Sequence, residues 1–271
     1  MRPAYIVGIL LIVAVIVAVV WWQGAGEDPA REDVTTAAEA GEVTPPPAVA
    51  PALEPAAAAP SPASEPIATT AVEPPPVVLP ELPASDAFVL TQIEPWSLPE
   101  TWLQRDELLS RATVVLVNAA AGKVPARQVS FLVPGEAYPA QKVGEQYYVD
   151  PAGFSRYDAY LDTLTAIEPA QLADFLRLVD PLLVQALAQL GEHRSPQALV
   201  RDTIARIESL QPLSAAPEST ELLRESVLYT YADPQLEALP DLDKQLLRIG
   251  PDNLSRLKLY MSELKKEYRL D

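Results

Sequence analysis

Aromatic rings and charged side chains alternate between Tyr138 and Tyr160, and this segment has the clearest chemical potential in the chain. Aromatic faces offer a large apolar contact while charged groups fix hydrogen bonds, which is typical of surfaces that bind a glycan or a peptide. The candidate binding residues are Tyr148, Asp150, Arg156, Tyr157 and Asp158. The same rings would also form the core beneath a β-hairpin that packs on a helix, and we favour this structural interpretation of the cluster.

Acidic residues in and after this segment suggest one enzymatic alternative. Glycoside hydrolysis needs two carboxyl groups at a set separation, and such a pair could come from Asp150, Asp158, Asp162 and Glu168. Residues 85–271 hold 27 acidic residues, however, so a suggestive pair is expected by chance. The chain has no cysteine, which excludes a thiolate nucleophile and a metal site with cysteine ligands. Its one histidine, His193, gives little support for a His-based metal site or a Ser-His triad. We predict no catalytic residue, no metal site and no cofactor, and favour a chain that is not an enzyme.

A second candidate site is the turn around Gly250, which separates two predicted helices. Its sequence is similar to the DNA-binding helix-hairpin-helix, in which backbone N–H groups contact a phosphate. Arg248 stands where the first glycine of that motif would be, so we favour a tight αα-hairpin in which Gly250 ends one helix and Pro251 opens the next. Arg248, Gly250 and Asp252 are the candidate interaction residues of this turn.

The charge of the chain argues against one class of partner. The formal net charge of −17 divides into +1 from Arg2, −9 from residues 24–84 (ten acids, one arginine) and −9 from residues 85–271 (27 acids, 18 bases). Because affinity for nucleic acid comes largely from Lys and Arg that neutralise phosphates, we predict no nucleic-acid partner. Without cysteine there is no disulfide, so a folded domain must depend on its apolar core.

The apolar run from Ile6 to Trp22 predicts a single transmembrane helix. At about 1.5 Å per residue, this run and its flanks span a hydrocarbon layer of about 30 Å, and the Trp pair at its end suits the headgroup region. Residues 1–5 carry one arginine while residues 24–33 are acidic, so we predict a cytoplasmic N-terminus and a periplasmic remainder at a bacterial inner membrane. A cleaved signal peptide is the alternative, but the Trp-Trp-Gln that ends the run makes a poor cleavage site.

Residues 24–84 predict a disordered linker rich in proline, alanine and glutamate. They hold 14 of the 29 prolines and no aromatic residue, so they cannot build a core. As polyproline II at about 3.1 Å per residue these 61 residues would reach roughly 190 Å, whereas a flexible coil would average about 45 Å. We interpret the segment as a spacer, and the alternative is a proline-rich ligand for a partner groove.

Apolar residues at helical spacing return after the linker and predict one domain over residues 85–271, mainly α with a small β-hairpin. The clearest helix runs from Pro169 to Leu190, with either a kink or a break into two helices near Pro181. One or two helices are expected over 98–121, and one helix over each of 196–210, 241–249 and 253–268. The β-branched and aromatic residues of 128–133 and 146–149 predict the two strands of the hairpin.

The last predicted helix carries one apolar stripe with spacings of three and four residues. The stripe consists of Leu254, Leu257, Met261, Leu264 and Tyr268. We expect it to pack on the core of its own domain. A coiled-coil homodimer is the alternative, but two heptads are fewer than a sequence argument for a coiled coil needs.

Three segments resemble a known family, in the same order along the chain. They are 148–160, 229–237 and 244–253, with the sequences YVDPAGFSRYDAY, YTYADPQLE and KQLLRIGPDN. In them the chain is similar to an uncharacterised family of Gram-negative bacterial proteins that is defined only as a domain of unknown function. The resemblance implies one folded domain behind an N-terminal membrane span and a proline-rich linker. It implies no catalytic residue.

Together these observations favour a non-enzymatic module anchored in the inner membrane. Its helical domain would be held away from the bilayer and would bind an envelope protein or the peptidoglycan of the cell wall. Tethering confines such a domain and raises its effective concentration near the membrane. The alternative is an enzyme that cleaves or modifies glycans with paired carboxylates near the aromatic cluster.

Overall fold

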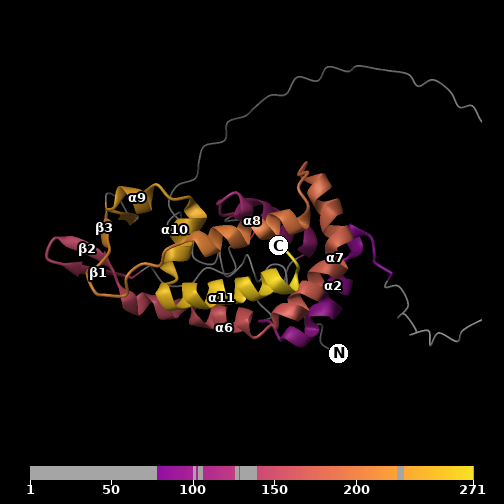
Figure 1. Ribbon diagram of the computed structural model, residues 1–271, viewed down its shortest axis with the longest axis horizontal. Helices are drawn as coiled ribbons and strands as arrows, with labels where there is room; N and C mark the ends of the chain where they lie inside the picture. Colours follow the sequence, from indigo (N-terminus) through magenta and orange to yellow (C-terminus); the bar gives the residue numbers. More distant parts are fainter. Residues whose placement is uncertain are drawn as a thin grey trace, which may run out of the picture. The chain divides into compact units, whose positions relative to one another are not determined.

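The computed structural model of the chain describes residues 78–99, 102, 106–125, 128, 139–224 and 229–270 (Figure 1). The predicted cytoplasmic N-terminus (1–5), the transmembrane helix (6–22) and all but the last residues of the linker (24–84) lie outside the described residues. Within the described ranges, no helix is long and apolar enough to cross a membrane. The C-terminal domain is mainly helical and carries a small antiparallel sheet, which confirms this part of the predicted fold class.

Four long helices form the centre of the domain. They are α4 (Leu108–Ala120), α7 (Pro169–Gln189), α8 (Pro196–Ser209) and α11 (Pro251–Glu267). Both α4 and α11 pack against α7 and α8 (Figure 1). Each helix can do so because its buried residues recur every three or four positions, as Leu172, Leu176 and Val179 do in α7.

Three short helices open the described part of the chain. They are η2 (Leu82–Ala84), α2 (Asp86–Ile93) and η3 (Glu94–Trp96). η2 packs on α7, and its Leu82, which the sequence places at the end of the linker, is buried in the core. The Trp96 ring meets the Phe175 ring of α7 edge to face, with centroids 5.4 Å apart. These contacts fix the start of the domain beside α7.

Side-chain caps determine where two of the long helices begin. The Ser195 hydroxyl accepts a hydrogen bond from the Ala198 N–H at 3.1 Å at the start of α8, as its sequence predicts. The start of α4 is capped by a residue of α2. The Asp86 carboxylate accepts hydrogen bonds from the backbone N–H groups of Glu107 and Leu108, at 2.8 and 3.0 Å. This cap ties α2 to α4.

Pro181 lies inside α7 without ending it. The helix runs unbroken from Pro169 to Gln189, so the break into two helices, one of the two outcomes expected here, does not occur. A proline leaves the carbonyl group four residues earlier, that of Arg177, without its helical donor. Residues on both sides of the proline, Val179 and Leu182 among them, are buried, and their packing outweighs this loss.

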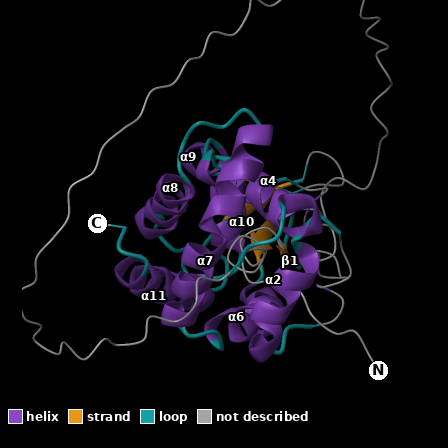
Figure 2. Ribbon diagram, turned by 90° about the vertical axis from the view of Figure 1, so that its right-hand side faces the viewer, coloured by secondary structure: helices purple, strands orange, loops and turns teal. Residues whose placement is uncertain are grey.

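A four-stranded antiparallel sheet lies at the end of the domain away from α2 (Figure 1). Its strands are β1 (Ala140–Val143), β2 (Gln146–Val149), β3 (Glu221–Leu223) and β4 (Thr230–Tyr231), paired in that order. Figure 2 views the domain from the α2 side, and the strands lie behind the helices. We call this part of the domain the sheet end.

The predicted hairpin is right in its second strand and wrong in its first. β2 pairs with β1, with Val143 opposite Gln146. The expected partner, 128–133, does not take this place, because the two neighbours of β2 in the sheet are β1 and β3. Gln128 is helical, and 129–133 lie outside the described residues. The pattern of β-branched and aromatic residues misses β1, whose sequence is Ala-Gln-Lys-Val. The tight turn that begins at Gly144, with φ +62°, is the stronger hairpin signal.

Four shorter elements connect the sheet to the bundle. They are η5 (Pro151–Tyr157), α6 (Asp158–Thr165), α9 (Pro234–Glu237) and α10 (Asp241–Arg248). α6 packs on α11, and α10 packs on both α8 and α11. The apolar stripe of α11 is buried inside the domain at Leu254, Leu257, Met261, Leu264 and Tyr268, as expected. The stripe is therefore part of the core and is not an exposed seam for a coiled coil.

Candidate functional site

The three segments that carry the family resemblance meet between the sheet and the helices, in what we call the junction. η5 lies against the turn between α10 and α11, where a Cβ atom added to Gly250 would meet the Phe154 side chain. Residues 229–237 lie against α10, because Arg248 donates a hydrogen bond to the Tyr229 carbonyl at 3.1 Å. The junction thus brings both predicted candidate sites into one region of the domain.

Tyr157, Tyr231 and Arg248 form the buried centre of the junction. Their exposed fractions are 3%, 2% and 4%, and the Arg248 guanidinium lies 5.6 Å from the Tyr231 ring centroid. Burial raises the pKa of the Tyr157 hydroxyl to about 12, although the neighbouring Arg156 and Arg248 charges oppose this rise. Two of the predicted interaction residues, Tyr157 and Arg248, are therefore core residues that a ligand cannot reach without local opening.

Glu237 and Lys244 extend the junction towards α9. The Glu237 carboxylate accepts a hydrogen bond from the Tyr231 N–H at 2.8 Å and pairs with the Lys244 ammonium group at 2.8 Å. Burial works against ionisation of this carboxyl, but the hydrogen bonds from Lys244 and Tyr231 outweigh it and lower the pKa of Glu237. These contacts hold β4 on α10.

The turn around Gly250 has the αα-hairpin geometry that its sequence predicts. Gly250 has φ +91°, and α11 begins at the following proline. Asn253, in the first turn of α11, donates hydrogen bonds to the Asp158 carboxylate at 2.8 Å and to the Phe154 carbonyl at 3.3 Å. Asp252 is exposed in that same first turn, where its negative charge suits the helix dipole. The turn therefore holds η5 against the start of α11.

Part of the chain matches a known protein family. A family model described as "Protein of unknown function (DUF3014)" matches residues 108–265. The chain belongs to this family. The match includes all three segments named above and confirms the predicted resemblance. No curated protein and no solved structure matches the chain.

The DUF3014 match begins with the first residue of α4 and ends in the last turn of α11. The family domain therefore contains the four-helix centre, the sheet and the junction. Three short helices, η2, α2 and η3, precede the matched region and pack on it.

Three of the four carboxylates proposed for glycan hydrolysis have structural contacts in the DUF3014 domain, and the fourth, Glu168, precedes α7 without a side-chain cap hydrogen bond. Asp150 caps η5 by accepting a hydrogen bond from the Ala152 N–H at 3.0 Å. Asp158 binds Asn253, and Asp162 pairs with the Arg256 guanidinium at 2.6 Å. Each of these three acids thus helps to hold η5 or α6 in place. These structural contacts account for the three acids without a catalytic role.

Tyr148 lies on the outer face of the sheet. On the inner face, Tyr147 of β2 stands opposite Leu222, which is buried. The side chains of a strand alternate between faces, so Tyr148 and its neighbour Glu221 face outward. The Tyr148 hydroxyl donates to the Gln146 side chain at 2.9 Å, and that amide donates to Glu221 at 3.0 Å. Of the predicted binding residues, only Tyr157 is buried. Asp158 is exposed, and Tyr148, Asp150 and Arg156 are half-buried, with the Arg156 guanidinium 5.7 Å from the Tyr157 ring centroid.

Leu223 makes the outer face partly apolar. Its exposed fraction is 42%. Leu223 stands opposite Thr230 of β4, and the side-chain alternation places it on the same face as Glu221. The outer face thus combines a tyrosine, a leucine and a polar network, a mixture that is common at protein interfaces.

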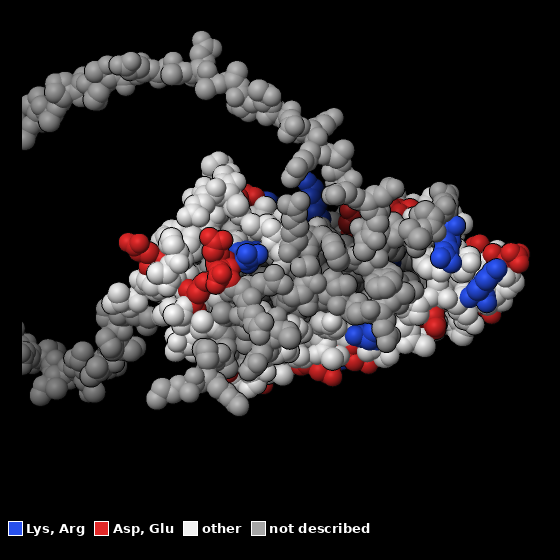
Figure 3. Space-filling view, turned by 180° about the vertical axis from the view of Figure 1, so that it is seen from behind, with Lys and Arg blue, Asp and Glu red and all other residues white. Residues whose placement is uncertain are grey.

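Two cations and two tyrosines gather beside β2, and we call this group the sheet-end patch. It consists of Lys142, Tyr147, Arg224 and Tyr229. The Tyr147 and Tyr229 ring centroids are 5.5 Å apart, and the Arg224 guanidinium lies 5.8 and 5.4 Å from them. The Lys142 ammonium group lies 5.7 Å from the Tyr147 centroid. Seen from behind, blue basic side chains gather with red acidic ones at the sheet end (Figure 3).

Sequence reasoning misses both cations of this patch. Lys142 faces Tyr147 across the β1–β2 pair, so its position follows once the turn at Gly144 is taken as the hairpin turn. Arg224 follows β3, which pairs with β2 across more than seventy intervening residues, and no local pattern predicts that pairing. The patch can therefore be found only in the folded chain.

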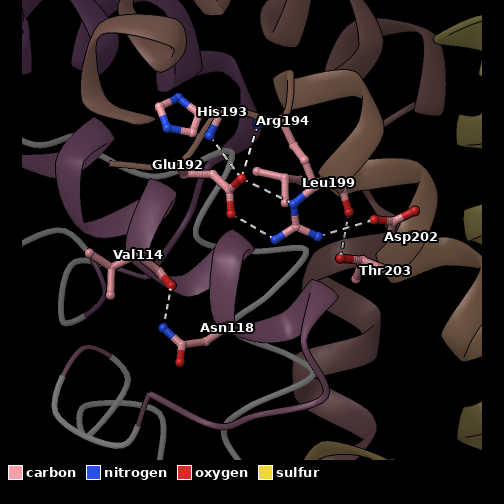
Figure 4. A network of polar contacts seen from close by, with 8 residues as sticks. All are labelled: Val114, Asn118, Glu192, His193, Arg194, Leu199, Asp202 and Thr203. Carbon is pink, nitrogen blue, oxygen red and sulfur yellow. Dashed lines mark hydrogen bonds and ion pairs between the residues drawn. The ribbon is translucent and has the colours of Figure 1, made fainter. Parts of the chain in front are cut away.

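The loop between α7 and α8 holds a separate polar network, shown in Figure 4. The Glu192 carboxylate accepts hydrogen bonds from the His193 and Arg194 N–H groups, and it pairs with the Arg194 guanidinium at 2.7 Å. Arg194 also reaches Asp202 at 3.3 Å. The bonds from Arg194 lower the pKa of Glu192 to about 2. His193 itself is exposed, as predicted, and the network serves to shape the loop.

A cavity of about 260 Å³ opens between the start of α4 and the end of α7. Its lining includes Glu107, Ser110, Arg111, Val114, Gln189 and Leu190. None of the predicted site residues lines it. In the described ranges, no group of three or more His, Cys, Asp or Glu residues is placed to hold a metal ion.

Proposed function

We propose that this DUF3014 chain is a non-enzymatic interaction module, anchored in the bacterial inner membrane and directed into the periplasm. The observation that carries the proposal is the outer face of the sheet, where Leu223 is exposed and Tyr148 is half-exposed, while Tyr157 and Arg248 are buried in the core. We infer that this face binds an envelope protein or the cell wall.

The position of the sheet within the domain supports this inference. The described chain begins at η2, which packs on α7, and the sheet lies at the other end of the domain (Figure 1). A tether that joins the domain at η2 therefore leaves the sheet end free to meet a partner. An extended linker raises the local concentration of such a surface near the membrane without adding any contact.

The sequence supplies the membrane part of the proposal. The apolar run 6–22 has the length of a membrane span, and the charges on its two sides favour a cytoplasmic N-terminus. The acidic, proline-rich residues 24–84 would carry the domain away from the bilayer. Deleting the linker should then reduce capture of the partner without moving the protein from the membrane.

The test is crosslinking and affinity capture of the full-length chain from native membranes. The variant Tyr148→Ala with Leu223→Ser should lose the captured partner, because both side chains leave the outer face. Leu259→Ser is the matched control, since Leu259 is 64% exposed on α11, away from the sheet. Circular dichroism of both variants checks that they fold.

Two results would contradict the proposal. The first is a partner that the sheet variant captures as well as the wild type does. The second is turnover of purified wall material by the wild type that is lost in Asp150→Asn or Asp158→Asn, since this would identify a glycan-cleaving enzyme instead. Recovery of wall fragments without turnover would keep the interaction module and name the wall as its partner.

A further inference from the structure

The sheet-end patch contains an arginine that no carboxylate of the described residues pairs with. Arg224 is exposed and makes no ion pair with any described residue. Lys142 has only a long contact of 3.7 Å with Glu145, a hairpin-tip residue whose side chain is 96% exposed. Exposed pairs of this kind contribute little, so both cations keep most of their charge for another partner.

Arg224 differs in its partners from two arginines of the helices. Arg177 pairs with Asp174, and Arg256 pairs with Asp162, each at 2.6 Å. Arg224 instead lies on two tyrosine rings, which attract a cation without cancelling its charge.

We propose that the sheet-end patch binds an acidic segment of a partner protein, with Lys142 and Arg224 each receiving a carboxylate. The patch lies on the side of the sheet that carries Tyr147 and not on the outer face, so the proposal goes beyond the proposed function and names a second contact surface at the sheet end. The guanidinium group presents paired N–H donors that match a carboxylate, and Arg224 can use them while it stays on the rings.

The arrangement of the rings decides between an acidic peptide and a sugar. A glycan would need a free aromatic face on which to stack. The Tyr147 ring already has Lys142, Arg224 and Tyr229 within 5.8 Å of its centroid, so little of its face is left for a sugar. The N–H groups of the two cations remain accessible, and these are donors for carboxylates.

The tyrosines also reduce the cost of binding. A free arginine side chain loses rotamer freedom when it binds a ligand. Arg224 lies against two rings, one of which, that of Tyr147, belongs to β2, so part of that loss has already occurred on folding. We therefore expect Arg224→Lys, which keeps the charge and loses the planar stacking, to weaken binding as well.

The experiment measures fluorescence anisotropy of a labelled peptide of alternating Glu and Ala with the full-length chain in detergent. A peptide of alternating Gln and Ala is the neutral probe. The wild type should prefer the acidic peptide, and Arg224→Gln should weaken binding about tenfold, because a charge-assisted hydrogen bond is lost. Raising the salt from about 50 to about 300 mM should weaken it further.

Controls separate the patch from the overall charge. Lys266→Gln changes the net charge equally at an exposed site on α11 and should leave binding unchanged. Arg224→Glu should reverse the preference, towards a peptide of alternating Lys and Ala. Thermal unfolding of every variant confirms that the domain is intact.

The outcomes distinguish this inference from the proposed function. Equal binding of the acidic and neutral peptides, or an equal effect of Lys266→Gln and Arg224→Gln, would overturn the patch as an acidic-peptide site. A captured partner that depends on Tyr148 and Leu223 would still uphold the interaction module. Wall fragments that compete with the acidic peptide better than any acidic protein segment does would also overturn the choice of partner. Acidic-peptide binding that appears only when the chain's own linker is removed would overturn that choice too, because the linker would then occupy the patch.

Discussion

Gly250 offers the sharpest test of how the junction is built. Its backbone, at φ +91° and ψ 162°, lies in a region that is nearly restricted to glycine. A Cβ atom at this position would lie 2.7 Å from the Phe154 Cβ and 2.8 Å from its Cδ2. Phe154 cannot simply withdraw, because its carbonyl accepts a hydrogen bond from Asn253. We therefore expect Gly250→Ala to be destabilising for two independent reasons.

The magnitude follows from the two costs. A non-glycine residue in this region of the Ramachandran plot costs about 1–3 kcal/mol. Overpacking a side chain into an occupied site costs about 1–3 kcal/mol more. Their sum is about 2–6 kcal/mol, which for a domain of this size lowers Tm by roughly 5–20 °C.

Thermal unfolding of the full-length chain, followed by far-ultraviolet circular dichroism, measures this loss. Gly191→Ala is the matched control, because Gly191 has φ +70° and no neighbouring atom within 4 Å of an added Cβ. It should lose only the conformational part, about 1–2 kcal/mol. Adding Phe154→Ala to Gly250→Ala should cost less than the two single changes added together, because the steric overlap is removed. Equal losses of Tm in Gly250→Ala and Gly191→Ala would refute the close approach of Phe154.

Two further predictions concern buried tyrosines. The Tyr260 hydroxyl is buried without a hydrogen-bond partner among the described residues, so Tyr260→Phe should raise the stability by about 1 kcal/mol; a lower Tm would contradict this. Burial raises the pKa of Tyr157 to about 12, above its ordinary value of 10.0, so the stabilisation that depends on the neutral form is complete below pH 10 and is lost as the pH rises through 12. Tyr157→Phe should therefore shift the alkaline unfolding midpoint upward, and an unchanged midpoint would contradict this.

The helices could be predicted from the sequence because their signals are local. Ser195 and Pro196 mark the start of α8, and the spacing of Leu172, Leu176 and Val179 marks the buried side of α7. Pro181 is ambiguous in the sequence, since proline can bend or end a helix. The surrounding packing decides the outcome, and only the folded chain contains that information.

The sheet could be predicted only in part because its pairing is not local. β2 has the aromatic and β-branched residues of a strand, but β3 and β4 contain three and two residues and lie far from β2 in the sequence. The same limit applies to the candidate site. Tyr148, Asp150, Arg156, Tyr157 and Asp158 are neighbours in the sequence, yet the fold sends Tyr148 to the outer face and Tyr157 into the core. The spacing of apolar residues in the sequence could not predict which of these two tyrosines is buried.

The location of the junction bears on how functional residues of this family should be sought. The three most recognisable segments meet where Arg248, Tyr231 and Gly250 hold the sheet on the helices. Substitutions there would abolish any function by unfolding the domain, so loss of function at these positions would say nothing about a binding surface. Arg224 and Leu223 are exposed and make few contacts with the core. A loss of partner capture with unchanged Tm at these two positions is therefore the result that separates recognition from folding.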